Sequence, residues 1–256
     1  MQNNNAPWTK GKLPLVLVAF VVSFCLSFFN PAQADLTYRQ YVAEINNFPL
    51  KKPRRKSWRD AQNTIAEITT HIQKKAAKYC IEINENSNCK SYWSVNLVKS
   101  SAFNAYATDG NRIIVYTGLL DQTSDDDEIA FVIAHEIGHH AHNHIIETRN
   151  RGMLGAVVGG ILGAVSGDVE VTSQMANMGA GIGRLSYSVT QEKEADAFAL
   201  RLIEDSGYDS AKARKILLRM ARMAGSIKTK FLASHPSGPD RLSEFDKIWR
   251  KMDAIK

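Results

Sequence analysis

The sequence predicts a mainly helical α+β domain that contains one small antiparallel sheet and one helix bearing a chemical motif. Three observations support this fold class. Apolar residues recur every three or four positions from Ser57 onwards, which indicates an amphipathic helix. Short alternating segments then flank Asp109-Gly110, a dipeptide typical of a hairpin turn. From Ser124 to the C-terminus the pattern is helical again, and its first helix is rich in histidine.

The first 34 residues have the pattern of a secretory signal peptide. Lys10 and Lys12 precede an apolar run from Leu13 to Phe29, and small residues frame a cleavage pattern that ends at Ala34. Cleavage there leaves 222 of the 256 residues and lowers the net charge from +6 to +4, because two lysines and no acid are removed. We therefore expect an exported chain, located in the bacterial periplasm. The 17-residue run is at the lower edge of spanning length, so a retained membrane anchor is the alternative.

We interpret residues 35–56 as an N-terminal extension and linker, and residues 57–256 as a single folded domain. The linker ends in a dense basic run, Lys51 to Lys56. Such a run is usually solvated, although it could also contact anionic lipid or nucleic acid. An exported protein seldom meets nucleic acid, so we expect no nucleic-acid partner and leave peripheral membrane association open. With 44% hydrophobic and 23% charged residues, the chain is not a disordered polymer.

Cleavage of the signal removes Cys25 and leaves two cysteines, Cys80 and Cys89. In an oxidising compartment these two can form a disulfide that closes a short loop. Two unpaired thiols are the alternative, because the sequence does not measure their separation.

The remaining elements follow in chain order. The helix that begins at residue 57 has one apolar stripe, formed by Trp58, Ala61, Ile65, Ile68, Ile72 and Tyr79. Strands are predicted around Val95 and Leu97, and at 103–107 and 112–117 on either side of the turn. The next helix should use Ser124 as its N-cap, place four acidic residues in its first turn, and run to about Arg149.

Residues 152–183 are rich in small side chains, with glycines at four-residue steps at positions 155, 159, 163 and 167. In a longer apolar segment this spacing would indicate helix packing in a membrane. The apolar part, 153–166, is too short to span a bilayer, so we expect a buried or mobile segment over a site. Helices are then predicted at 191–206, 210–224 and 239–252.

The helix after Ser124 contains His135-Glu136-Ile137-Gly138-His139. Two histidines four positions apart point to the same side of a helix, so both imidazoles can bind one ion. Glu136 can reach a water molecule on that ion, which is the zincin arrangement with glutamate as general base. The motif also occurs by chance, so a third ligand is needed.

Three further histidines follow the motif. On one continuous helix, His140 and His144 would point away from the motif face and be solvated. His142 would lie near that face, either as a group that supports a ligand or as one that is simply packed.

A candidate third ligand lies in the stretch Gln191 to Asp196. A carboxylate on a second helix can complete a site of two histidines and one glutamate, with an open position for water. Glu192 and Asp196 are four positions apart, so one could bind the metal while the other orients a ligand histidine. Glu194 projects elsewhere.

Four stretches, in order, carry a resemblance to a known family. They are Asn104-Ala105-Tyr106 with Val115 to Leu120, His135 to His139, Glu192 to Asp196, and Ser234-His235-Pro236 with Arg241. The chain resembles the HtpX/BepA/LoiP-type zinc metallopeptidases, which are gluzincins of metallopeptidase family forty-eight and have Oma-type mitochondrial relatives. The small periplasmic members are the most similar, and the resemblance covers roughly residues 60–250.

The resemblance implies that residues 57–256 form one zinc metallopeptidase domain of zincin type, with one Zn²⁺ per chain. The zinc ligands would be His135, His139 and Glu192. Glu136 would be catalytic, Asp196 would support the site, and the strand at Asn104, Ala105 and Tyr106 would pair with substrate.

In the expected mechanism, Glu136 takes a proton from the zinc-bound water and passes it to the leaving amine. The oxyanion needs a donor besides zinc, for which the candidates are His235, Tyr187 and Arg241. His235 has two other interpretations. In similar proteins this histidine can plug the zinc, so that its loop would gate the site, or Ser-His-Pro merely caps the last helix.

These features predict an endopeptidase that removes misfolded or unassembled exported proteins, with an extended substrate added as a strand. One alternative is a zinc-stabilised chaperone or assembly factor whose proteolysis is latent or gated. Another is a membrane-anchored structural protein, which requires an uncleaved signal. The sequence predicts no oligomeric state.

Overall fold

The structure is a computed structural model that describes residues 31–50, 55–84, 89, 92–183, 186–224 and 235–254. Most of the predicted signal, residues 1–30, lies outside the described residues, as do Lys51 to Arg54 of the basic run. The chain divides into two compact units, Met1–Gln40 and Tyr41–Lys256. In the first unit the described residues form the start of helix α2 (Pro31–Asn47), and the elements that follow α2 belong to the second unit.

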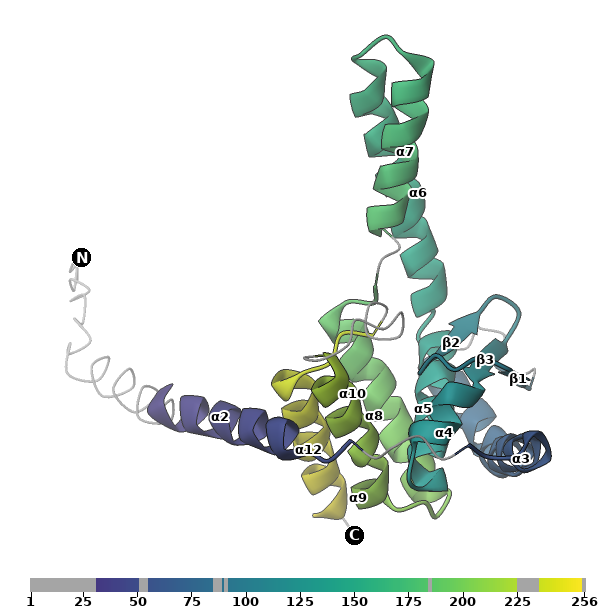
Figure 1. Cartoon of the computed structure of the whole chain (residues 1–256), viewed down its shortest axis with the longest axis vertical. Coiled ribbons are helices and arrows are strands. Elements are labelled where there is room, and N and C mark those ends of the chain that lie inside the picture. The colour runs from purple at the N-terminus through teal and green to yellow at the C-terminus, as the bar shows by residue number, and fades with distance from the viewer. Residues whose placement is uncertain are drawn as a thin grey trace, which may run out of the picture. The chain divides into compact units, whose positions relative to one another are not determined.

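The second unit is mainly helical and carries one small sheet, which confirms the predicted fold class (Figure 1). Its helices and strands are α3 (Trp58–Ile83), β1 (Ser94–Val98), β2 (Ala105–Thr108), β3 (Arg112–Tyr116), α4 (Thr117–Gln122), α5 (Asp126–Ala141), α6 (His144–Ala164), α7 (Val169–Gly183), α8 (Val189–Asp205), α9 (Ser210–Ala213), α10 (Lys215–Ala224) and α12 (Pro239–Asp253). Among the described residues, no helix is both long enough and apolar enough to cross a bilayer.

Helix α3 begins as predicted after Ser57, whose hydroxyl accepts a hydrogen bond from the Asp60 N–H at 3.1 Å. Most of the predicted stripe is buried in the core, namely Ala61, Ile65, Ile68, Ile72 and Tyr79. Trp58 is the exception: it lies in the first turn, stays 37% exposed, and has the Lys99 ammonium 4.9 Å from its ring centroid.

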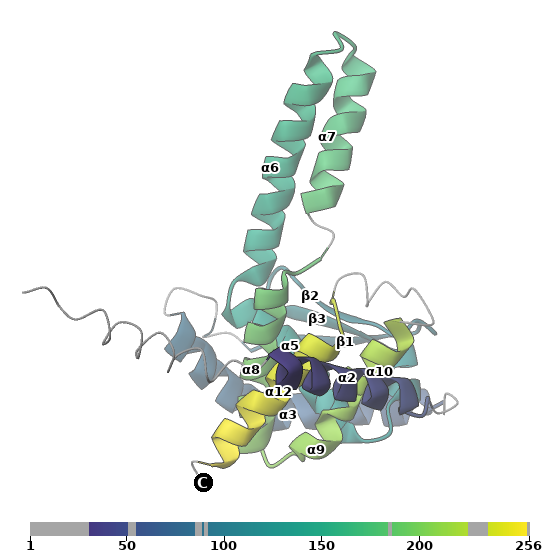
Figure 2. The same ribbon diagram turned by 90° about the vertical axis from the view of Figure 1, so that its left-hand side faces the viewer.

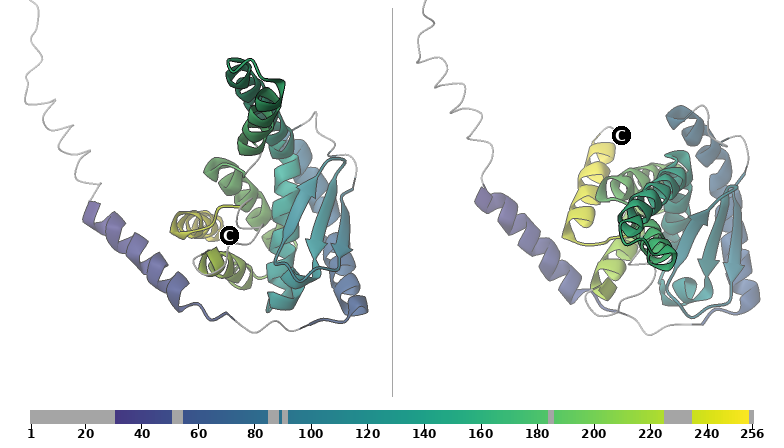
Figure 3. Two further views of the ribbon diagram at one scale, coloured as in Figure 1. Left: turned by 45° about the horizontal axis from the view of Figure 1, so that its top comes forward. Right: turned by 90° about the horizontal axis from the view of Figure 1, so that it is seen from above.

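The sheet is mixed, with the strand order β1-β3-β2. Strands β2 and β3 form the predicted antiparallel hairpin, and the turn residues Gly110 and Asn111 both have positive φ. Strand β1 instead pairs parallel to β3, so the expected antiparallel pairing holds for one of the two strand pairs. Side-chain alternation predicts a strand but not its direction, which explains the difference. Helix α3 packs on β1, whereas α5 packs on β2 and β3 (Figure 3).

Helix α5 is shorter than predicted. It starts from Asp125 as N-cap, one residue after the predicted Ser124, and ends at Ala141 instead of near Arg149. Asn143 then adopts a left-handed conformation with φ of 60°, which asparagine tolerates better than most residues, and α6 begins at once with His144. His144 therefore does not continue the helical positions of α5.

Helices α6 and α7 pack along each other as a hairpin that projects from the other helices of the second unit (Figures 1 and 2). Gly159 and Gly163 allow this close approach, because a Cβ at either position would overlap the α7 backbone. Large apolar side chains on the outer face of α6 are exposed. The expectation that residues 152–183 form a segment over a site is therefore wrong, since their glycines serve the packing of two helices.

The C-terminal helices follow the prediction with small changes. Helix α8 is preceded by a capping box formed by Ser188 and Gln191. The helix predicted at 210–224 is divided into α9 and α10, and α12 starts with Pro239. These helices complete the core with α3, α5 and the sheet.

The second half of α2 is attached to the folded unit. Tyr41 and Ile45 are buried in the core. The Arg214 guanidinium pairs with Asp246 of α12 (Nε to Oδ1, 2.6 Å) and with Glu44 of α2 (Nη2 to Oε2, 2.9 Å). Part of the predicted extension thus packs on the C-terminal helices.

Candidate metal centre

Three predicted ligands, His135, His139 and Glu192, converge in the buried interior between α5 and α8. The Nε2 atoms of the two histidines lie 3.0 Å apart. The Glu192 carboxylate is 3.4 Å from His139 Nε2 and 3.6 Å from His135 Nε2. Donor atoms in a tetrahedral zinc site with Zn–N distances of about 2.0–2.1 Å are about 3.3 Å apart, so the geometry of this donor set fits zinc.

Gly138 determines how closely the two ligand-bearing helices approach. A Cβ added there would lie 3.0 Å from the Ala195 Cα and 3.1 Å from its carbonyl oxygen. Because both atoms are backbone, α8 could accommodate a larger residue only by moving as a whole. The glycine within the motif therefore helps to bring Glu192 opposite the two histidines.

Asp196 and Arg241 contact the side chains of the predicted ligands. Asp196 Oδ1 lies 2.9 Å from His135 Nδ1, which leaves His135 Nε2 for the metal. Arg241 donates to both Asp196 oxygens (2.6 and 2.8 Å), and its Nη1 lies 2.5 Å from Glu192 Oε2. Burial raises the pKa of both carboxyl groups, but Arg241 and the neighbouring histidines together outweigh burial and keep the pKa of Asp196 and Glu192 below their usual values.

His144 is the residue that sequence reasoning missed. It is buried, and its Nδ1 lies 2.9 Å from His139 Nδ1, while its Nε2 lies 3.1 Å from Glu194 Oε2. The prediction that His144 is solvated is therefore wrong. Glu194 does project away from Glu192 and Asp196, as predicted, and its exposed side chain contacts His144. Asn143 was the available signal, because an asparagine after a helix is a candidate for the left-handed conformation that redirects the chain.

The two other histidines also make contacts. His140 is half-buried with its Nε2 3.3 Å from the Arg112 carbonyl, so the prediction that it is solvated is wrong; burial lowers its pKa to about 4. His142 stacks on His144 with ring centroids 5.3 Å apart, which agrees with a packed or supporting group.

His235 lies directly among the ligands. It is fully buried, and its Nδ1 is 3.0 Å from Glu192 Oε1 and 3.3 Å from His135 Nε2. Burial lowers the pKa of His235, but the charges of Glu192 and Glu136 outweigh this effect and raise it above its usual value. His235 thus stands where a fourth ligand or a plug would stand. Ser234, which begins the predicted gating loop, lies outside the described residues.

Glu136 faces the same space from α5. Its Oε2 accepts a hydrogen bond from the Ala107 N–H of β2 at 2.8 Å. Its Oε1 has no hydrogen-bond partner among the described residues and lies 3.5 Å from His235 Nε2. One oxygen is therefore fixed while the other is available.

The predicted substrate strand lies beside Glu136. Ala105 is fully buried, Tyr106 is 37% exposed, and the Asn104 side-chain oxygen is buried without a hydrogen-bond partner in the described part of the chain. Strand β2 is an edge strand of the sheet.

The three oxyanion candidates differ in their contacts. Tyr187 stacks on His139 with ring centroids 3.7 Å apart. Burial, together with Glu136 and Glu192, raises the pKa of Tyr187, so its hydroxyl keeps its proton. His235 lies close to Glu136 and Glu192, whereas the Arg241 guanidinium is occupied by Asp196 and Glu192, which favours a positioning role for Arg241.

The predicted disulfide is present. Cys80 and Cys89 are bonded, with their Cα atoms 5.4 Å apart, and this closes the loop after α3.

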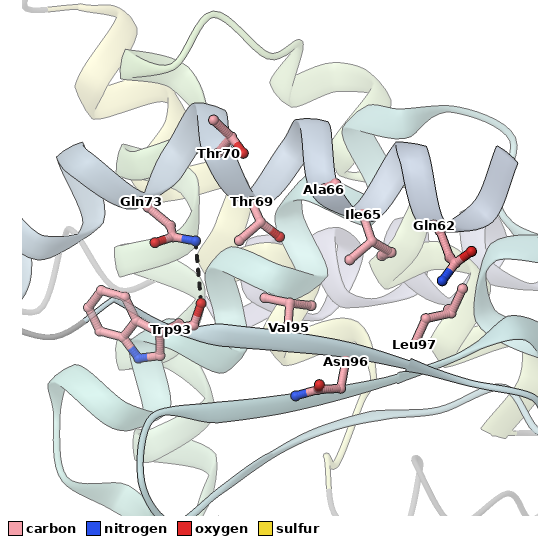
Figure 4. A pocket seen from close by; sticks show the side chains of 10 residues that line it. All are labelled: Gln62, Ile65, Ala66, Thr69, Thr70, Gln73, Trp93, Val95, Asn96 and Leu97. Atoms are coloured by element: carbon pink, nitrogen blue, oxygen red, sulfur yellow. Dashed lines mark hydrogen bonds between the residues drawn. The ribbon is translucent and has the colours of Figure 1, made fainter. Parts of the chain in front are cut away.

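A cavity of about 510 Å³ lies elsewhere, between α3 and β1 (Figure 4). Its lining includes Thr69, Gln73 and Trp93 but none of the residues of the metal centre. It is therefore separate from the candidate metal centre.

Comparison with known proteins identifies a family of peptidases. The model of peptidase family M48 matches residues 66–248. The chain is 32% identical over 149 residues to the mitochondrial metalloendopeptidase OMA1 of Arabidopsis thaliana, which covers 58% of this chain and 30% of that protein. It is 27% identical over 190 residues to the metalloprotease LoiP of Escherichia coli (strain K12), covering 71% of this chain and 72% of the relative.

A third relative is the beta-barrel assembly-enhancing protease of Yersinia pestis, 27% identical over 160 residues, or 58% of this chain and 32% of that protein. The chain thus spans about a third of the OMA1 and beta-barrel relatives and most of LoiP. Because the family model covers well over half of the sequence, the chain belongs to peptidase family M48.

Proposed function

We propose that this chain is a zinc-dependent endopeptidase. The observation that carries the proposal is the buried set of His135, His139 and Glu192, whose donor atoms lie 3.0 to 3.6 Å apart beside Glu136. When bound, a zinc ion lowers the pKa of a coordinated water and polarises a carbonyl group.

Glu136 has the contacts of a general base. The Ala107 N–H holds Oε2 in place, and Oε1 is left to take a proton from the attacking water. The same oxygen then gives the proton to the leaving amine. Tyr187, with its raised pKa, stays protonated and can donate a hydrogen bond to the developing oxyanion.

The edge of β2 offers a binding mode for an extended substrate. The Asn104 carbonyl accepts a hydrogen bond from the Tyr116 N–H of β3, so the backbone groups of the next residue, Ala105, point away from β3. Because Ala105 is fully buried, a substrate strand can pair with these groups only after the residues that cover this edge move. The buried Asn104 side-chain oxygen can accept a hydrogen bond from a substrate N–H. Recognition through main-chain groups has little sequence preference, which suits unfolded protein segments.

The cellular role that we propose is removal of misfolded or unassembled proteins in the bacterial envelope, after export of the chain and cleavage of its signal. The names of two relatives, a metalloprotease and a beta-barrel assembly-enhancing protease, support this role by similarity alone. The disulfide between Cys80 and Cys89 is consistent with an oxidising compartment.

Gated or latent proteolysis is the second candidate, and the position of His235 favours it. A histidine 3.0 Å from Glu192 Oε1 and 3.3 Å from His135 Nε2 would occupy the position that water needs. In that case the chain would act as a zinc-stabilised assembly factor until His235 leaves the site.

Digestion of a reduced, unfolded protein tests the proposal. The purified chain should cleave it, lose activity in a zinc chelator, and recover activity when zinc returns. Failure to cleave any unfolded protein with zinc bound would contradict constitutive proteolysis. His235→Ala then separates the alternatives: a faster variant supports the plug, whereas a slower variant with unchanged zinc content supports an oxyanion role.

A further inference from the structure

The outer face of α6 is an exposed apolar surface. Seven large side chains are 51–85% exposed, namely Met153, Leu154, Val157, Val158, Ile161, Leu162 and Val165. They follow one side of the helix at steps of three and four residues, opposite the glycines that contact α7. Soluble monomers rarely expose a continuous apolar patch of this kind, so the surface calls for a partner.

The dimensions and charge of this face fit a lipid interface. No ionisable residue occurs between Arg151 and Asp168. At a rise of 1.5 Å per residue, the stretch from Met153 to Val165 is about 18 Å long. This is little more than half of the roughly 30 Å hydrocarbon core of a bilayer, so the helix can lie in the interface but cannot span the core.

Helix α7 gives the hairpin its opposite, polar side. Its exposed residues include Ser173, Gln174 and Asn177, and the apolar residues Val169, Val171 and Met178 are exposed among them without forming a continuous stripe like that of α6. At the tip, Asp168 accepts hydrogen bonds from the N–H groups of Glu170 (2.7 Å) and Val171 (3.2 Å). Two acidic side chains at the tip oppose insertion with the tip leading, because a charge inside hydrocarbon is costly. The hairpin would therefore lie flat, as interfacial amphipathic helices do.

The packing within the hairpin does not depend on water. Gly159 and Gly163 bring α6 against α7, and Gly179 of α7 approaches the Gly155 carbonyl in the same way. Close contact through small residues is how helix pairs associate in lipid, where the hydrophobic effect between helices is absent. The hairpin can thus keep its structure at a membrane.

We propose that the outer face of α6 docks on a lipid bilayer, with α7 turned towards water. A second copy of the chain is a poorer occupant. Protein–protein interfaces have a polar rim and about one hydrogen bond per 100–200 Å², whereas this stripe has no ionisable residue between Arg151 and Asp168. Since the hairpin joins α5 to α8, docking would hold the metal centre beside the membrane. This inference rests on the fold and not on proteolysis.

Site-specific fluorescence tests the docking. Cys80 and Cys89 are bonded to each other, so a chain with Cys25→Ser and Glu136→Gln can carry one reactive cysteine, at Ile161→Cys or at the control position Asn177→Cys. An NBD label at each position is mixed with vesicles of pure phosphatidylcholine, with and without brominated acyl chains. We expect brighter, bromine-quenched emission at position 161 and little change at 177, both unaffected by 0.5 M salt.

The absence of any vesicle-dependent change at position 161 would overturn the proposal. Emission at position 161 that rises with protein concentration in the absence of vesicles, together with a dimer in light scattering, would show that the face binds a second copy of the chain instead of lipid. Binding to anionic vesicles alone, abolished by salt, would also overturn the proposal. It would indicate that the basic run Lys51 to Lys56 contacts the membrane.

A partition assay on the Glu136→Gln chain adds a second variant. The double change Ile161→Ser and Leu162→Ser should reduce vesicle binding on the order of a hundredfold, about tenfold for each large aliphatic side chain removed. The matched change Ser173→Ala and Gln174→Ala on α7 should leave binding unchanged. Because both sites are exposed, neither change should unfold the chain, and circular dichroism checks this. Equal binding by the two variants would contradict the docking surface. These assays measure vesicle binding and not cleavage. A failure of the docking proposal can therefore be distinguished from a failure of the proposed peptidase activity.

Discussion

Replacing His144 by alanine should weaken the metal centre without removing a ligand. His139 uses Nε2 towards His135 and Glu192, so its Nδ1 carries the proton and His144 Nδ1, 2.9 Å away, accepts it. His144 in turn donates from Nε2 to Glu194 at 3.1 Å. The chain of hydrogen bonds fixes the tautomer and the orientation of His139.

The expected magnitude follows from the burial of these groups. Loss of the partner of a ligand histidine typically costs 10- to 100-fold in metal affinity or activity, or about 1.4–2.7 kcal/mol. We expect a value near the upper end. His139 is fully buried, so its N–H would be left without a partner, which by itself costs about 1–3 kcal/mol.

Competition with a chromogenic chelator measures the zinc affinity, and cleavage at saturating zinc measures the remaining activity. His142→Ala is the matched control, because His142 stacks on His144 but shares no hydrogen bond with His139 among the contacts described. It should bind zinc almost as the unmodified chain does. Wild-type zinc affinity in a folded His144→Ala variant would refute the reasoning.

Three further changes act on stability. Replacing Cys80 and Cys89 by serine opens a ten-residue loop and should lower the free energy of unfolding by about 2.7 kcal/mol; unchanged urea unfolding would contradict this. Arg219→Ala leaves the fully buried Glu128 carboxylate without its guanidinium, 3.1 Å away. It should cost about 3–5 kcal/mol in the same assay, and a loss below 1 kcal/mol would argue against the buried pair. Gly138→Ala should lower the free energy of unfolding by about 1–3 kcal/mol, because the added methyl group crowds the α8 backbone. Zinc affinity should also fall, because Glu192 is displaced. An unchanged zinc affinity would show that α8 moves to accommodate the methyl group without displacing Glu192.

The local chemistry of this site could be predicted from the sequence. His135 and His139 are four residues apart on α5, so their side chains must lie on the same face of that helix. Glu192 and Asp196 have the same spacing on α8. The hairpin of β2 and β3 could be predicted for a similar reason, because Asp109-Gly110 fixes the turn within four residues. Each of these features depends on short-range geometry.

Features that depend on a single backbone angle or on distant contacts were not predicted, because their sequence signals are weak or absent. The left-handed Asn143 ends α5 and turns His144 into the site, whereas helical periodicity alone placed His144 in solvent. The parallel pairing of β1 with β3 depends on where the chain crosses, which strand alternation does not record. The glycines of α6 have the same spacing whether the segment packs on another helix of this chain or covers a site. Only the structure distinguishes these two possibilities.

The most direct test of the central claim is a paired measurement on Glu136→Gln. Glu136 is not one of the proposed zinc ligands, and the side-chain oxygen of a glutamine at this position can still accept a hydrogen bond from the Ala107 N–H. The variant should therefore retain one zinc per chain by metal analysis and lose cleavage of an unfolded protein by at least about a hundredfold, the lower range for loss of a general base. Undiminished cleavage by a zinc-loaded Glu136→Gln chain would contradict the account.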